Sequence, residues 1–314
     1  MQAPARLDGL PAVHLRRELV GQGMTDHAIA REVARGNLHK VRHGAYTAAA
    51  PWHELDEGGR YALLCVAAAA QARTDVVLSH LSAAGLWGAP LWDVSAELVH
   101  LTRTDQKTGR KEAGIQQHRG ILLPEDVWSG AGVQVMSPTR AALELTTLTD
   151  VEHAVVEIDW LLHTGLTDVQ KLRTRYAATT SWPNTLHTDL VLRLVDGRSE
   201  SVLESRGRFM CWSQRLPTPI PNYPIRNRRG RVVARVDLAW PELGVFVELD
   251  GKVKYETHRR PGESVTDAVV REKRRESMIV ELTGWRCIRL VWADLRHPAA
   301  CAARIRAGFR PTAA

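Results

Sequence analysis

The sequence of 314 residues lacks any apolar run long enough to cross a membrane and has few cysteines. Its longest apolar stretches, such as residues 61–70, fall well short of the roughly 20 residues that a membrane helix needs. The N-terminus has no basic-then-apolar signal-peptide layout. The four cysteines are far apart and form no CxxC pair, which argues against a disulfide framework and a cysteine-based zinc site. We therefore expect a cytoplasmic protein without a membrane partner.

The motifs of several common enzyme classes are also missing. The sequence has no Walker loop, no GxGxxG fingerprint and no Ser, Cys or His arrangement typical of nucleophilic catalysis. What it does have is an excess of basic residues, with 42 Lys and Arg against 35 Asp and Glu, for a net charge of +7. Such a balance fits a polyanionic partner, although many soluble proteins share it.

The order of the predicted elements indicates an α+β or mixed α/β protein with more than one domain. We expect a small helical unit with a hairpin over residues 1–50 and a mixed α/β extension over 51–181. A helical connector and a final region of strand–strand–strand–helix–strand–helix are expected over 182–314. A cluster of prolines at positions 217–224 predicts a sharp boundary.

The first 50 residues have the pattern of a winged helix. One helix is predicted over residues 14–23, and a second follows Thr25, whose hydroxyl suits an N-cap. A basic hairpin turning at His43 and Gly44 completes the order helix, turn, helix, hairpin. A winged helix of this kind binds either DNA or another protein.

Two acidic residues flank a predicted turn near the C-terminus. If Pro241 pairs with Gly244, the positions of antiparallel partners sum to 485, which places Asp237 opposite Glu248. Directly opposed side chains share a face and lie roughly 5 Å apart. Two opposed carboxylates repel, and a divalent metal between them would resolve the conflict. The alternative is a solvent-exposed hairpin rim with ordinary charges.

Residues at every second position after Glu248 extend this pattern. Asp250, Lys252 and Lys254 would point to the same side of an unbroken strand, while Val245, Val247 and Leu249 would face the core. Paired acids with a nearby lysine are the groups that metal-assisted phosphodiester hydrolysis requires. We expect Asp237 and Glu248 to bind Mg²⁺ or Mn²⁺, because both ions prefer oxygen ligands.

The C-terminal region resembles the PD-(D/E)xK nuclease fold, and within it the endonucleases related to very-short-patch-repair (Vsr-like) enzymes. The resemblance covers about residues 199–308 and is carried by VLESRGR, VDLAWPELGVFVELDG, KVKY, REKRRE and GWRCIRLVWADL. It implies a restriction-endonuclease-like core in which Asp237 and Glu248 are metal ligands and Glu204 is a supporting acid. The family has a lysine two positions after the second acid, where this sequence has Asp250. The lysine's role then passes to Lys252 or Lys254, or is absent.

The N-terminal region resembles the AbiEi-type antitoxins over roughly residues 1–178. The resemblance is carried by GMTDHAIAREVARGNLHKVRHGAYTA, SHLSAAGLWGAPL and MSPTRAALEL. If this unit reads DNA, the helix from Thr25 to Arg35 enters the major groove. The candidate contacts to phosphates or base edges are Arg31, Arg35, Lys40 and Arg42.

Two further basic segments are candidate nucleic-acid contacts. Arg228 and Arg229 lie in an arginine-rich hairpin before the Asp237 strand, where they either follow a nucleic-acid backbone or improve solubility. Arg271 and Arg275 are four positions apart and share one face of a predicted helix. That face is either a phosphate-binding stripe beside the acids or a solvated surface with internal ion pairs.

The sequence thus supports two functions of different classes. One is a DNA-binding protein with a Mg²⁺-dependent endonuclease domain in bacterial defence or a toxin–antitoxin system. The other is a non-catalytic repressor or antitoxin with a degenerate nuclease fold. In either case the expected partners are DNA and a cognate toxin or a second copy of the chain.

Overall fold

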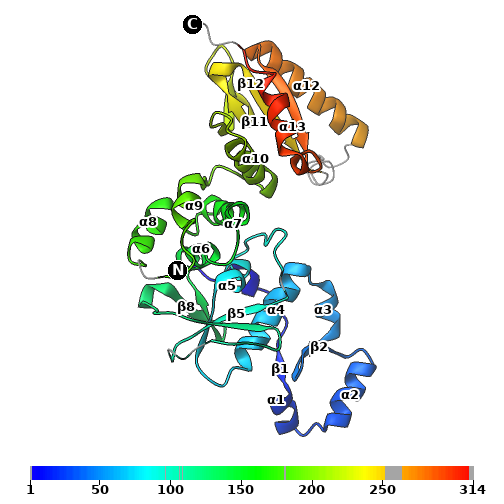
Figure 1. Cartoon of the computed structure of the whole chain (residues 1–314). Helices are drawn as coiled ribbons and strands as arrows, with labels where there is room; N and C mark the ends of the chain where they lie inside the picture. The colour runs from blue at the N-terminus through cyan, green and yellow to red at the C-terminus, as the bar shows by residue number, and fades with distance from the viewer. Residues whose placement is uncertain are drawn as a thin grey trace. The chain divides into compact units, whose positions relative to one another are not determined.

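The computed structural model describes residues 2–95, 97–105, 107, 109–179, 182–251 and 264–310, and it shows an α+β protein (Figure 1). The chain divides into two compact units, Met1–Val195 and Asp196–Ala314. The winged-helix region and the α/β extension therefore share one unit. The division falls later than the boundary at 181 and 182 expected from the sequence, because α9 (Thr188–Leu194) buries Val191 and Leu192 in the core of the first unit. Within the described ranges, no helix has the length and apolar character to cross a membrane.

The first 50 residues contain the predicted helices and hairpin. The elements are η1 (Ala5–Leu7), β1 (His14–Leu15), α1 (Arg16–Gly21), α2 (Asp26–Ala34), β2 (Leu38–Arg42) and β3 (Ala45–Ala48), with strand order β1-β3-β2. The Thr25 hydroxyl caps α2 by accepting the amide of Ala28 at 3.2 Å, as expected. Helix α1 is shorter than predicted, because His14 and Leu15 pair with β3 instead.

A six-stranded mixed sheet covered by helices forms the rest of the first unit. Its strand order is β6-β7-β5-β4-β9-β8. The strands are β4 (Val76–Leu78), β5 (Val99–Arg103), β6 (Lys111–Glu112), β7 (Ile115–Arg119), β8 (Val127–Gly130) and β9 (Val133–Met136). The helices are α3 (Ala49–Glu54), α4 (Glu57–Ala70), α5 (His80–Leu86), η2 (Pro124–Asp126), α6 (Pro138–Leu145), α7 (Val151–His163), α8 (Val169–Ala177) and α9.

Helix caps explain where two of these helices begin. Ser137 accepts the amide of Arg140, and Pro138 occupies the first turn of α6. Asp168 caps α8 by accepting the amide of Lys171 at 2.8 Å, while the neighbouring Thr167 hydroxyl bonds to Thr139.

The second unit is a four-stranded sheet with strand order β10-β11-β12-β13. The elements are α10 (Val202–Ser213), β10 (Ile220–Arg226), β11 (Val232–Trp240), η3 (Pro241–Leu243), β12 (Val245–Asp250), α12 (Val265–Thr283), β13 (Arg286–Val291), η4 (Asp294–Arg296) and α13 (Pro298–Arg306). Strands β10, β11 and β12 are antiparallel, whereas β12 and β13 are parallel. Two of the clustered prolines lie inside β10, an edge strand, where a missing amide is tolerated.

The turn between β11 and β12 sets the register that the sequence predicts. The observed partners are Leu238 with Val247, Ala239 with Phe246 and Trp240 with Val245, so every pair sums to 485. Gly244 adopts φ of 65° at the end of this turn, a left-handed conformation that glycine accommodates easily. Val245, Val247 and Leu249 face the core as expected, in one apolar cluster with Leu203 of α10 and Ile305 of α13.

Candidate functional site

The three acids that the sequence selects are buried in the second unit. Glu204 is at the start of α10, Asp237 is in β11 and Glu248 is in β12, and their exposed fractions are 4%, 8% and 4%. The β11–β12 ladder ends at Leu238 and Val247, so Asp237 and Glu248 lie just beyond its last pair. Burial of a carboxylate is costly unless it is paired or binds a cation. The alternative of a solvent-exposed rim is therefore wrong.

Glu248 is paired with an arginine of the helix that covers its face of the sheet. Arg275 of α12 donates to Glu248 Oε1 at 3.0 Å and to Glu272 Oε1 at 2.7 Å. A second guanidinium nitrogen of Arg275 donates to the carbonyl of Arg235. Burial alone would lower the pKa of Arg275, but the carboxylates of Glu248 and Glu272 raise it. Arg275 thus lies beside the acids, with its charge directed to Glu248.

Asp250 is held by an arginine that the sequence did not single out. Arg289 of β13 donates to Asp250 Oδ2 at 2.6 Å and to Glu276 of α12 at 2.7 Å. Although burial opposes it, bonding to Glu276 and Asp250 raises the pKa of Arg289. Arg289 is also the Cα partner of Glu248 in the parallel β12–β13 ladder. A guanidinium therefore lies next to Asp250, the position at which the nuclease resemblance leads one to expect a lysine.

Asp237 and Glu204 accept hydrogen bonds from backbone amides, and Glu204 also from the Ser201 hydroxyl and from one asparagine. Asp237 Oδ2 accepts the amide of Leu249 at 2.6 Å. Glu204 accepts the amide of Glu200 at 2.9 Å and the side-chain amide of Asn222 at 3.0 Å. Asn222 has φ of 49° within β10, which is unusual for a residue in a strand. Asn222 was not identified from the sequence, because the alternation of apolar and polar residues does not reveal a left-handed backbone conformation within a strand.

A metal at these acids would have few protein ligands. No group of three His, Cys, Asp or Glu suited to a metal occurs in the part of the chain that the structure describes. Mg²⁺ is commonly bound through one or two carboxylates with several waters, and Asp237 and Glu248 are the two carboxylates that could hold it here. The candidate lysines Lys252 and Lys254 lie outside the described residues.

Arginines are concentrated at the tip of the β10–β11 hairpin. Arg228 and Arg229 are exposed there, together with Arg226 and Arg231. The side chain of Asn227 accepts the amides of Arg229 and Arg231, which shapes the turn. On α12, Arg271 is partly buried and Arg274 is exposed. The hairpin tip is thus a basic and exposed segment of the second unit.

The basic residues of the N-terminal unit divide into two groups. Arg31, Arg35 and Lys40 are exposed, and Arg35 pairs with Glu32 at 3.2 Å. Arg42 is partly buried and donates to the carbonyl of Ala113 at 3.1 Å, and its burial lowers its pKa. The expected phosphate contact from Arg42 is therefore not supported, because its guanidinium is directed into the protein.

A buried cluster of titratable groups in the first unit was not predicted. His100 Nδ1 bonds to His118 Nε2 at 2.9 Å, and the His80 and His118 rings stack with centroids 3.7 Å apart. Glu144 accepts the His80 amide at 2.9 Å and Arg140 Nε at 2.8 Å. Burial lowers the pKa of His100 to about 4 and of His118 to about 3, and it raises that of Glu144. These histidines are therefore neutral at physiological pH.

The second unit thus has two buried carboxylates on adjacent strands and exposed arginines at the β10–β11 turn. The chain is similar to two proteins of Mycobacterium tuberculosis, Rv2248 of strain H37Rv and MT2308 of strain CDC 1551, both named as uncharacterized. Each is 28% identical over 289 residues, which cover 90% of this chain and 96% of the relative. No protein-family model matches the chain.

Proposed function

We propose that the protein is a cytoplasmic DNA-binding protein whose second unit hydrolyses phosphodiester bonds with Mg²⁺ or Mn²⁺. The observation that carries the proposal is the burial of Asp237 and Glu248 on the neighbouring strands β11 and β12, just beyond the last pair of their ladder. Burial of each acid has to be compensated, and a divalent cation between them would compensate both.

In this account the residues of the second unit have separate roles. Asp237 and Glu248 would hold the metal, which would supply positive charge to polarise the phosphate and to activate a water. Glu204, fixed by Asn222, is the supporting acid. The exposed arginines Arg228 and Arg229 bind the phosphate backbone.

Incubation of the full-length protein with plasmid DNA and either metal, against an EDTA control, tests the proposal. We expect nicked or linear DNA only in the presence of a metal. A radiolabelled RNA of the same sequence, tested in parallel, identifies the nucleic acid that is cleaved.

The ion pair between Arg275 and Glu248 favours a second candidate function. Because the arginine already balances the acid, the same fold is compatible with a non-catalytic repressor or antitoxin that binds DNA and a cognate toxin, or a second copy of itself. That function predicts DNA binding without cleavage and a melting temperature that does not respond to Mg²⁺ or Mn²⁺.

A further inference from the structure

The two faces of the sheet in the second unit differ in charge. Helices α10 and α13 pack on one face and α12 packs on the other. Helix α12 carries four acids and four bases, so its charge is balanced. Residues 202–215 and 295–310, which contain α10 and α13, include one acid, the buried Glu204. Their exposed arginines are Arg215, Arg296, Arg304, Arg306 and Arg310, and of these Arg304 pairs with Asp294 at 3.4 Å. The surface of α10 and α13 is therefore positively charged and suits a polyanion.

Aromatic side chains lie on the same surface. Trp212 of α10 is 43% exposed, and the Phe209 ring lies 5.5 Å from it at an angle of 40°. One turn earlier, the guanidinium carbon of Arg206 lies 5.2 Å from the centre of the Trp292 ring. Phe209 and Trp212 are not part of the apolar cluster that Met210 of the same helix forms with the sheet. Residues three positions apart are neighbours on a helix surface, so Arg206, Phe209 and Trp212 form one row.

Two arginines from different helices meet at the end of this row. Arg306 of α13 donates to the carbonyl of Gln214, the residue before Arg215. The amide of Arg215 donates to the carbonyl of Trp212 at 2.9 Å, which places the arginine one turn beyond the exposed ring. An exposed aromatic ring next to cationic side chains is the combination by which proteins bind unpaired bases and their phosphates, because the ring stacks on a base of any sequence.

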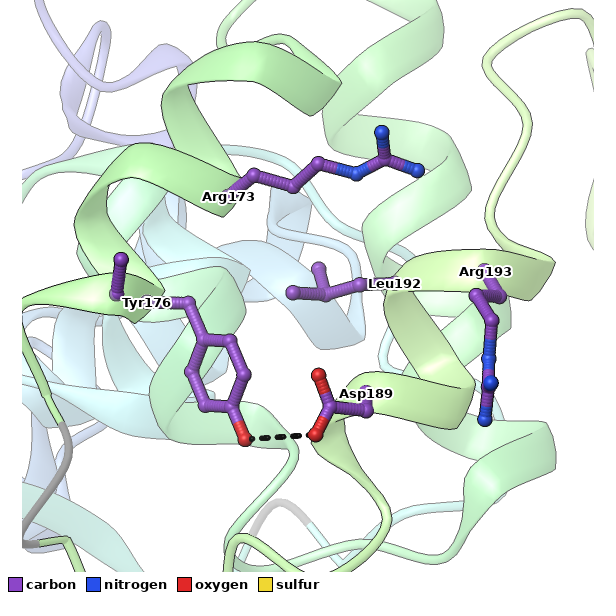
Figure 2. Close-up of a pocket in the computed structure, with 6 residues that line it drawn as sticks. Arg173, Tyr176, Asp189, Leu192 and Arg193 are labelled. Carbon is purple, nitrogen blue, oxygen red and sulfur yellow. Dashed lines mark hydrogen bonds between the residues drawn. The ribbon is translucent and has the colours of Figure 1, made fainter.

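The arginines of α8 and α9 in the first unit lack this combination. Figure 2 shows Arg173 and Arg193 directed apart around a hollow of about 470 Å³. The ring in this hollow, Tyr176, is partly buried, and its hydroxyl donates to Asp189 at 3.4 Å. Arg193 is thus an exposed arginine that lies four residues after an acid and without an exposed ring beside it. It serves as a control for the loss of surface charge alone.

We propose that the surface of α10 and α13 binds a single-stranded nucleic acid, with a base stacked on Trp212 and backbone phosphates on Arg215 and Arg306. Bases inside a duplex are stacked on each other and do not reach such a ring, so the surface favours a single strand. It lies across the sheet from α12, whose Arg275 pairs with Glu248. The proposal thus goes beyond the proposed function and requires neither the metal nor the acids.

Fluorescence anisotropy of the full-length protein in EDTA, with a labelled DNA strand and with the same strand annealed to its complement, tests this proposal. We expect Trp212→Ala to weaken binding of the single strand about tenfold, because stacking on one base is lost, and to leave duplex binding unchanged. Trp212→Phe keeps a ring and should retain most of the affinity. Arg215→Gln and Arg306→Gln should each weaken single-strand binding and reduce its salt dependence by about 0.7 units of slope. The matched controls Leu282→Ala, at a 40% exposed residue of α12, and Arg193→Gln should bind the strand as the wild type does.

Two results would overturn the proposal. An equal loss of single-strand and duplex affinity in Trp212→Ala would show that the ring does not stack on an unpaired base. An unchanged single-strand affinity in this variant would remove the surface from nucleic-acid binding, and a change in its sedimentation would then identify Trp212 as a protein contact. An RNA strand of the same sequence, measured in parallel, identifies the preferred nucleic acid. Because no metal is present, the outcome does not depend on whether the protein cleaves DNA.

Discussion

Arg275 and Glu248 are 27 residues apart in sequence, and the arginine's Nη1 lies 3.0 Å from the carboxylate Oε1. The exposed fractions of the two side chains are 29% and 6%, so the pair is only partly accessible to water. Under the proposed function, a metal at Glu248 would have to share this acid with Arg275. The ion pair is therefore a stabilising contact that a metal would have to compete with.

Replacing Arg275 should separate these two effects. Arg275→Gln leaves Glu248 without its guanidinium, so we expect the free energy of unfolding to fall by about 1–3 kcal/mol in EDTA. The shift of the melting temperature on adding Mg²⁺ should be larger than in the wild type, because the competitor is gone. Urea unfolding and thermal melts measure both effects, and Arg274→Gln, an exposed neighbour, is the control. An unchanged metal response would show that Arg275 does not compete with a metal.

Asn222 should tolerate glycine better than alanine. Its φ of 49° strains a residue with a Cβ, by about 1–3 kcal/mol, whereas glycine adopts it freely. Both substitutions remove the hydrogen bond to Glu204, so the difference between them reports the backbone alone. We expect Asn222→Ala to be less stable than Asn222→Gly by about 1 kcal/mol in urea unfolding. Equal stabilities would contradict the strained conformation.

The histidine cluster of the first unit should make the protein less stable in mild acid. The unfolded histidines have a pKa near 6.5, whereas burial lowers the pKa of folded His100 to about 4. The unfolded chain therefore binds more protons between these values, and stability is lost as the pH falls from about 6.5 to 4. His100 contributes at most about 3 kcal/mol to this loss.

Buried glutamates change the stability in the opposite direction as the pH falls, so the contribution of His100 has to be measured against a matched variant. Burial raises the pKa of Glu157 to about 7, which adds stability as the pH falls below that value. The difference between wild type and His100→Gln removes this common contribution. We expect the two urea midpoints to converge as the pH falls from 7 to 4, while His27→Gln, at an exposed histidine, follows the wild type. Parallel curves for wild type and His100→Gln would show that His100 is not buried in its neutral form.

DNA binding by the N-terminal unit should depend on the exposed basic residues and not on Arg42. Each of Arg31→Ala, Arg35→Ala and Lys40→Ala should weaken binding and reduce the salt dependence by about one unit of slope, because one phosphate contact is lost. Arg42→Ala should leave the slope unchanged, since its guanidinium bonds to Ala113. Fluorescence anisotropy with a labelled duplex over a salt series measures this. If the first three variants leave the slope of affinity against salt unchanged, α2 and β2 do not contribute to DNA binding.

Local patterns in the sequence were sufficient to predict much of the second unit. The turn at Pro241–Gly244 and the alternation in Val245–Leu249 set the β11–β12 register, and both are properties of adjacent residues. The helix that carries Arg271 and Arg275 was likewise predicted from a local pattern, and it forms as α12. Such elements are determined mainly by local hydrogen bonds and depend little on contacts with the rest of the chain.

The partners of the site residues were not predictable in the same way. Arg289 and Asp250 are 39 positions apart and meet only because β13 pairs in parallel with β12. Arg42 turns inward because Ala113, 71 positions away, lies beside it. Asp168 rather than Thr167 caps α8, because the Thr167 hydroxyl is bonded to Thr139 of α6. Each outcome depends on packing between distant segments, which a single sequence does not display.

The most direct test of the proposed function is plasmid cleavage by Glu248→Gln, with DNA binding measured in the same samples. The substitution keeps the size of the side chain and removes the charge that a hard cation requires, so we predict metal-dependent cleavage at least about 100-fold slower than wild type. DNA affinity should be retained, and Glu281→Gln, at an exposed acid of α12, should cleave normally. A Glu248→Gln protein that cleaves as fast as the wild type, or a wild-type protein that cleaves nothing with Mg²⁺ or Mn²⁺, would contradict the account.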